Sequence, residues 1–239
     1  MDDHAAMLHL TMGIVRMFQW RWSEAEHCYR RAIALEPGNA YPHMMCASLY
    51  VHLRRFGEAL SEARTGVELD PLDPMTNARL VECLHLARQH DDAIRDGRTA
   101  IELIPDFHLT YWPVAWSLGA LGVWREAWTL CAKARSLSAG QPLCEGFFGY
   151  TAGMSGHRVQ AHAVLRDLKD RRRHGYGPAL AIALTYQGLA DTTACLEWLE
   201  TAFEERDPFL MELAVWPGYD PLRRRARFRK LLRKLQLPE

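Results

Sequence analysis

The sequence has no excess of either charge. Its 239 residues include 29 basic and 29 acidic side chains, so the formal net charge is zero when histidine is neutral. Proteins that bind nucleic acid through its phosphates usually carry a basic surplus, and this balance argues against that class. Hydrophobic residues make up 49% of the chain, which is enough for it to fold.

Paired cysteines and targeting segments are also missing. None of the six cysteines forms a CxxC pair, so we expect buried thiols in a reducing compartment and no disulfide framework. The opening MDDHAAM has neither the basic nor the apolar region of a signal peptide, and a cytoplasmic protein is expected. Residues 107–124 contain no Asp, Glu, Lys or Arg, but Pro113 and two glycines interrupt them, and we expect no membrane span.

Common catalytic motifs do not occur. The chain has no HExxH, no glycine-rich phosphate loop and no nucleophile elbow, and no cofactor is predicted. Ser48 and His52 lie four residues apart on one predicted helix, and Glu82 and His85 lie three apart on the matching face of the next. An enzyme or a metal site is the minor hypothesis, and these four residues are where it would be sought first.

A repeat of 34 residues is what the sequence does contain. Pro37, Pro71 and Pro105 follow one another at this interval. The segment RRFGEALSEARTGVELDP, residues 54–71, shows the pattern most clearly. Small residues recur at the same interval in three series, with few exceptions: Gly13, Ala47, Val81, Ala115, Gly149 and Ala183; Ala25, Ala59, Ala93, Ala127, Ala161 and Cys195; Ala32, Gly66, Ala100, Ala134, Leu168 and Ala202. An unbroken step over six units is typical of a solenoid.

Each unit reads as a pair of helices. Small side chains let two helix axes approach closely, and bulky apolar residues at helical spacing fill the remaining space. Proline after the second helix prevents it from continuing. We predict an all-α solenoid of six units over residues 1–209, with no long linker between them.

Residues 210–239 lie outside the repeat. Asp220 and Pro221 have the residue types of a helix start, and an apolar stripe follows. Eight basic residues surround this stripe: Arg223, Arg224, Arg225, Arg227, Arg229, Lys230, Arg233 and Lys234. We predict a basic capping helix that closes the open end of the solenoid. The alternative is an amphipathic helix that docks an acidic protein, a membrane surface or nucleic acid.

The pattern of Gly or Ala on the first helix, Ala on the second and a closing Pro resembles the tetratricopeptide repeat. This resemblance covers residues 6–209 and implies a right-handed superhelix whose first helices line an inner groove. The segments FQWRWSEAEHCYRRAIALEPGNA (18–40) and LTYQGLADTTACLEWLETAFEERDPFL (184–210) also resemble the C-terminal repeat regions of certain bacterial signalling proteins. That second resemblance implies a partner-binding arm.

The inner positions of the repeat predict the binding surface. They are rich in Met and aromatic residues, which suit an apolar peptide or helix of a partner protein. Of the Lys, Arg and Asn set with which some repeat clamps hold a peptide carboxylate, only Arg79 is present. Some of these aromatic residues could instead be covered by neighbouring helices or by the ends of the chain, and a small-molecule sensor or enzyme using the same cavity is the alternative. The predicted groove residues are Met44, His52, Arg79, Glu82, His85, Trp112, Trp116, Phe147 and Tyr150.

Overall fold

The computed structural model describes residues 3–175 and 178–239, and within these ranges it contains helices and no strand. Twelve α-helices of the described chain form the repeats: α1 (Asp3–Phe18), α2 (Trp22–Leu35), α3 (Ala40–His52), α4 (Phe56–Leu69), α5 (Pro74–Leu86), α6 (His90–Leu103), α7 (His108–Ala120), α8 (Trp124–Leu137), α9 (Pro142–Met154), α10 (Arg158–Arg173), α11 (Ala179–Gly188) and α12 (Thr192–Glu204). Two 3₁₀ helices, η1 (Pro208–Ala214) and η2 (Pro217–Leu222), and the short α13 (Ala226–Lys234) follow them.

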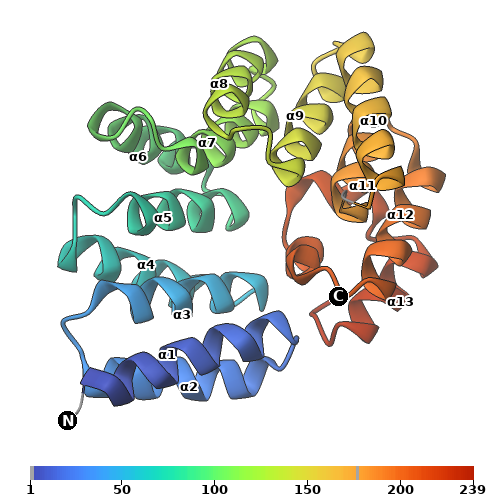
Figure 1. Cartoon of the computed structure of the whole chain (residues 1–239). Coiled ribbons are helices and arrows are strands. Elements are labelled where there is room, and N and C mark those ends of the chain that lie inside the picture. Colours follow the sequence, from blue (N-terminus) through green and yellow to red (C-terminus); the bar gives the residue numbers. More distant parts are fainter. Residues whose placement is uncertain (1–2, 176–177) are drawn as a thin grey trace.

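The helices stack in consecutive pairs along an arc (Figure 1). The backbone itself has the period of the sequence, because the turn inside each pair holds one residue in the left-handed region. These turn residues follow one another every 34 residues: Trp20, Arg54, Arg88, Gly122, Gly156 and Ala190. The predicted α-solenoid of helix pairs is therefore confirmed.

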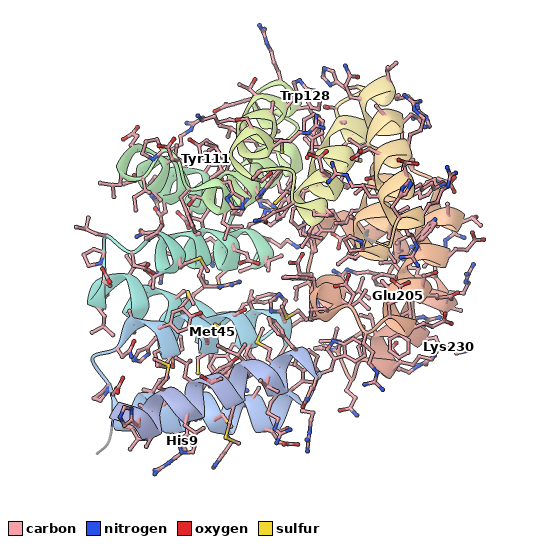
Figure 2. The ribbon with its side chains drawn as sticks, viewed as in Figure 1. His9, Met45, Tyr111, Trp128, Glu205 and Lys230 are labelled. Carbon is pink, nitrogen blue, oxygen red and sulfur yellow. The ribbon has the colours of Figure 1, made fainter. Side chains whose placement is uncertain are left out.

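The small residues of the repeat lie where helices pack. Ala25, Ala59, Ala93, Ala127 and Ala161 on the second helices are completely buried. On the first helices, a side chain at Gly13 would collide with the ring of Tyr29. Larger side chains fill the spaces between the stacked helices, and Figure 2 labels one of them, the buried Met45 of α3.

The sequence predicts no disulfide framework and no membrane span. All six cysteines are free and buried. Residues 107–124 form α7 and the turn after it, and α7 has only 13 residues. None of the described helices is both long and apolar enough to cross a membrane.

The C-terminal region differs from the prediction of one helix beginning at Asp220 and Pro221. This dipeptide lies inside η2, and α13 begins six residues after Asp220, at Ala226. Two short 3₁₀ helices precede α13, each with proline at its start, Pro208 and Pro217, and the second of them occupies the first residues of the expected helix. Proline lacks an N–H group and breaks a longer helical ladder at these points.

The end of the chain returns to its beginning and closes the arc into a ring (Figure 1). The indole nitrogen of Trp22 donates a hydrogen bond of 2.9 Å to the carbonyl oxygen of Leu235. The ring of Trp20 stacks on Phe203, with centroids 5.4 Å apart. The guanidinium of Arg88 lies 2.8 Å from a carboxylate oxygen of Asp220.

The basic residues of α13 lie on its outer side. Its apolar face is buried, including Phe228, Leu231 and Leu232, while Lys230 is exposed (Figure 2). Arg227 pairs with Glu200 of α12 at 2.7 Å. The apolar face thus packs against the solenoid, and part of the positive charge is neutralised within the chain.

Candidate functional site

The inner face of the arc is covered in its C-terminal half by the chain itself. We call residues 208–222, which comprise η1 and η2, the C-terminal segment. Its Trp216 is 1% exposed and lies 5.7 Å from the ring of Trp116 on α7, 4.5 Å from Tyr150 on α9 and 4.9 Å from Tyr219, measured between centroids. One indole therefore fills the space between two first helices of the repeat.

The nine predicted groove residues lie mostly beneath other parts of the chain, which is the alternative that the sequence left open, and their contact with a partner stays a prediction. Three of them are partly buried: Arg79, Glu82 and Trp116. The other six are buried: Met44, His52, His85, Trp112, Phe147 and Tyr150. The physical reason is that the C-terminal segment and neighbouring helices supply the apolar partners that the prediction assigned to another protein.

Three of the predicted aromatic residues do form one cluster. Trp112 and Trp116 of α7 stack at 6.3 Å, and Phe147 of α9 lies 4.6 Å from Trp116 with its ring edge-on. Met44 is different, because it packs in the core and lines neither of the two cavities described below. The repeat register therefore placed the aromatic rings together but not Met44.

Two cavities of the described chain lie on the inner face beside Trp116. The first has a volume of about 350 Å³ and its apolar wall comes from α5, α7, α9 and η1, with Met75, Leu109, Leu143, Phe209 and Met211 among its residues. The second, of about 330 Å³, lies on the other side of Trp116 and Trp216. Ligand sites in proteins are usually apolar clefts of this size with a few polar groups.

The polar groups of the first cavity include His52, Arg79, Glu82 and Glu212. Arg79 forms a salt bridge with Glu82 three residues later on α5. Burial, together with the adjacent Glu82 carboxylate, raises the pKa of Glu212 above its ordinary value, and Arg79 partly opposes this. Burial and then the charge of Arg79 lower the pKa of His52 to about 3. The sequence prediction had His52, Arg79 and Glu82 in the groove but missed Glu212, which lies outside the repeat.

The four residues of the minor enzyme hypothesis do not form one catalytic group. Nδ1 of His52 bonds to the backbone carbonyl oxygen of Ser48 at 2.5 Å, and so does not activate the serine hydroxyl. His85 is separate from His52 because it lines the second cavity, where its Nδ1 is 2.9 Å from the hydroxyl of Ser117. Ser48 and His85 therefore join no common site with His52 and Glu82.

Comparison with known proteins gives matches at the level of structure. No protein-family model matches the sequence, and a search of curated proteins finds no significant match. The solved structure of Pseudomonas aeruginosa PilF is similar with a TM-score of 0.60, 14% identity, and coverage of 98% of this chain and 99% of that one. PilW, described as a widely conserved type IV pilus biogenesis factor, gives a TM-score of 0.62 at 13% identity, covering 95% and 98%. TTC0263, described as a thermophilic TPR protein of Thermus thermophilus, gives 0.57 at 16% identity, covering 95% and 98%.

The chain has the tetratricopeptide-repeat fold. At these identities the likeness concerns the fold alone, and the site must be argued from its own residues. The first cavity is lined largely by the first helices of the pairs, and the second is lined by first helices together with residues of the C-terminal segment.

The buried His85 predicts a loss of stability in acid. Burial, and then the neighbouring charges of His90 and Arg88, lower its pKa well below the ordinary value of 6.5. The native state keeps His85 neutral, whereas the unfolded chain binds a proton below pH 6.5, so stability is complete above that pH and falls beneath it. One such histidine removes about 1.4 kcal/mol of unfolding free energy between pH values of roughly 7.5 and 5.5.

Urea unfolding of wild type and His85→Asn at several pH values measures this term. Asparagine keeps a group near the position of Nδ1 that can bond to Ser117, and we expect the variant to lose about 1 kcal/mol less than wild type on acidification. His162→Asn, at an exposed position of α10, is the control and should follow wild type. Equal pH slopes for all three proteins would contradict a neutral buried His85.

Proposed function

We propose that this protein is an interaction scaffold that holds an apolar segment of a partner protein in the part of its inner face that the C-terminal segment leaves open. The observation that carries the proposal is the first cavity, whose wall is mainly apolar and which stays accessible. Leu109 and Phe209 at its rim are 36% and 40% exposed. The ring of Phe18 on α1 lies 6.4 Å from that of Phe209 and extends the apolar surface toward the first repeat.

We call this surface the open groove and define it by Phe18, Met75, Leu109, Leu143 and Phe209. A bound apolar side chain would remove itself and the rim from water, and each ~100 Å² of apolar area so buried contributes about 2.5 kcal/mol before the cost of ordering. The buried aromatic cluster under the groove gives it a rigid floor. A peptide or helix with apolar side chains fits this surface better than a charged ligand does, because most of the residues that line the cavity are apolar.

The resemblance of the terminal segments to repeat regions of bacterial signalling proteins supports a regulatory partner as the first class to test. The balanced charge and the internal ion pairs of α13 speak against nucleic acid. An apolar protein segment at the open groove, in a cytoplasmic setting, is therefore the favoured interpretation.

A peptide library displayed on phage, selected on the immobilised protein, tests the proposal. We expect enrichment of sequences with aromatic or long aliphatic residues and micromolar binding of a synthetic peptide in a fluorescence-polarisation titration. Leu109→Asp places a charge at the rim and should weaken binding about 10-fold or more, since burying an unpaired carboxylate is costly. Leu72→Asp is the matched control, because Leu72 is 70% exposed in the turn between α4 and α5. Absence of selected sequences, or equal binding to both variants and wild type, would refute the proposal.

A further inference from the structure

One polar cluster on the inner face has the donor set of a metal site. A ring nitrogen of His52 and one carboxylate oxygen each from Glu82 and Glu212 all lie within 4.8 Å of one another. The three residues come from separate elements, α3, α5 and η1. Their closeness is therefore produced by the fold and not by their spacing along one helix. All three line the first cavity.

His52 is held in the form that binds a metal. Its side chain is 1% exposed, and Nδ1 is engaged with the carbonyl oxygen of Ser48. A carbonyl can only accept, so Nδ1 carries the proton and Nε2 keeps its lone pair. Among the described residues Nε2 has no hydrogen-bond partner. Metal-binding histidines almost always have this second contact, because it fixes the tautomer and the ring orientation.

The charges around the histidine favour a cation. Glu82 and Glu212 supply two carboxylates to a largely buried position, and the guanidinium of Arg79 offsets one of them through its bond to Glu82. The second carboxylate, that of Glu212, is expensive to ionise at this buried position when it is alone, and a bound cation would stabilise its charged form. Arg79 engages Oε2 of Glu82, which leaves Oε1 for a ligand.

We infer that His52, Glu82 and Glu212 form a binding site for one divalent transition-metal ion, with Zn²⁺ as the best fit. One imidazole and two carboxylates suit zinc, which takes three protein ligands and an open fourth position at about 2.0–2.2 Å. Calcium and magnesium are disfavoured, since they prefer six or more oxygen ligands. The three side chains must move together by about 1 Å, because ligand atoms of a tetrahedral site lie about 3.3 Å apart.

The position of Glu212 gives the site a structural consequence. It belongs to η1, while the other two ligands belong to helices of the second and third pairs. A bound ion therefore links the C-terminal segment to the N-terminal half of the solenoid across the inner face. The inference does not rest on the proposed partner binding, because none of its three ligands belongs to the open groove, although they line the same cavity.

Titration of the untagged, EDTA-treated full chain with ZnCl₂, in competition with a chromophoric chelator, tests the site. We expect one tight ion per chain, and about 10-fold or greater weakening in both Glu212→Gln and His52→Asn. Each variant keeps the local shape, and asparagine can still donate to the Ser48 carbonyl. His85→Asn, which removes a buried histidine from the other cavity, is the matched control and should bind as wild type does.

Hydrogen exchange gives a second measurement, because Zn²⁺ bound at other histidines would not protect the amides around Glu212. Zn²⁺ should slow exchange of the amides in residues 208–216 in wild type but leave Glu212→Gln unchanged. If His52→Asn fails to fold by circular dichroism, Glu212→Gln carries the test alone. Binding that is weaker than about 100 µM, or equal in wild type and Glu212→Gln, would overturn the site, because ordinary surface histidines would then account for it.

Discussion

Replacing Trp216 by alanine is expected to lower the unfolding free energy by about 3–5 kcal/mol, the usual cost of removing a fully buried tryptophan. For a chain of this length that corresponds to a fall in Tm of about 6–20 °C. The side chain contacts Trp116, Tyr150 and Tyr219, and it fills the space between α7 and α9. Its loss leaves a cavity that rigid neighbouring helices cannot close.

The same substitution should loosen the C-terminal segment on the inner face. The segment also buries Leu210, Leu213 and Leu222. Its polar contacts to the rest of the solenoid are few, such as the bond of 2.7 Å from Gln187 to the carbonyl oxygen of Gly218 and the Arg88–Asp220 pair. Surface ion pairs of this kind contribute about 1 kcal/mol or less. We therefore expect faster hydrogen exchange in residues 208–222 and new binding of a hydrophobic dye.

Two control variants separate this effect from a general loss of tryptophan. Trp216→Phe should cost less than about 1.5 kcal/mol, since a ring remains and the indole nitrogen has no hydrogen-bond partner among the described residues. Trp198→Ala removes a partly buried indole of α12, outside the inner face, and should leave exchange of the segment unchanged. A Trp216→Ala protein with a Tm within about 2 °C of wild type would show that the segment does not depend on this anchor.

The architecture could be predicted because the 34-residue period acts locally and repeats. Ala25, Ala59 and Ala93 occupy equivalent positions between two packed helices, so the same small residue recurs in the sequence at each of them. Six observations of one pattern leave little freedom for the fold. The helix pairs follow from that pattern.

The position of the C-terminal segment could not be predicted in this way. Residues 208–222 occur once, so no period assigns them a neighbour, and their place depends on contacts with residues far away along the chain. The sequence contained one signal for this position. Phe209, Met211, Val215 and Trp216 are too apolar for a segment that caps the solenoid and stays exposed to solvent. An apolar inner face and an apolar tail together indicate that one covers the other.

In the candidate metal site, too, the residues inside the repeat could be placed from the sequence and the residue outside it could not. The register placed His52 and Glu82 on matching faces of neighbouring first helices, and the structure brings them together. Glu212 completes the group from outside the repeat, where register carries no information. His85 was grouped with them because it follows Glu82 by three residues, but the helix turns it to the other side of Trp116.

Replacing Gly153 by alanine is expected to destabilise the protein by about 3 kcal/mol or more, at the upper end of overpacking effects, with a fall in Tm of about 6–12 °C. A Cβ atom at Gly153 of α9 would meet the backbone of Gly188 and Leu189 closer than 3.0 Å, a separation that real Cβ atoms essentially never show. A flexible side chain could move aside, but a helix backbone cannot, so α9 and α11 must separate.

Gly57→Ala is the matched control for this prediction, because Gly57 is also helical, in α4, and a Cβ there meets nothing within 4 Å. Alanine at that position should raise the unfolding free energy by about 0.5–1 kcal/mol through the lower conformational entropy of the unfolded chain. Thermal unfolding followed by circular dichroism compares the two variants directly. Opposite signs are expected if direct backbone contact joins the fifth and sixth repeats. A Gly153→Ala protein as stable as wild type would mean that a gap lies between α9 and α11, and the close packing of the fifth and sixth repeats would then be wrong.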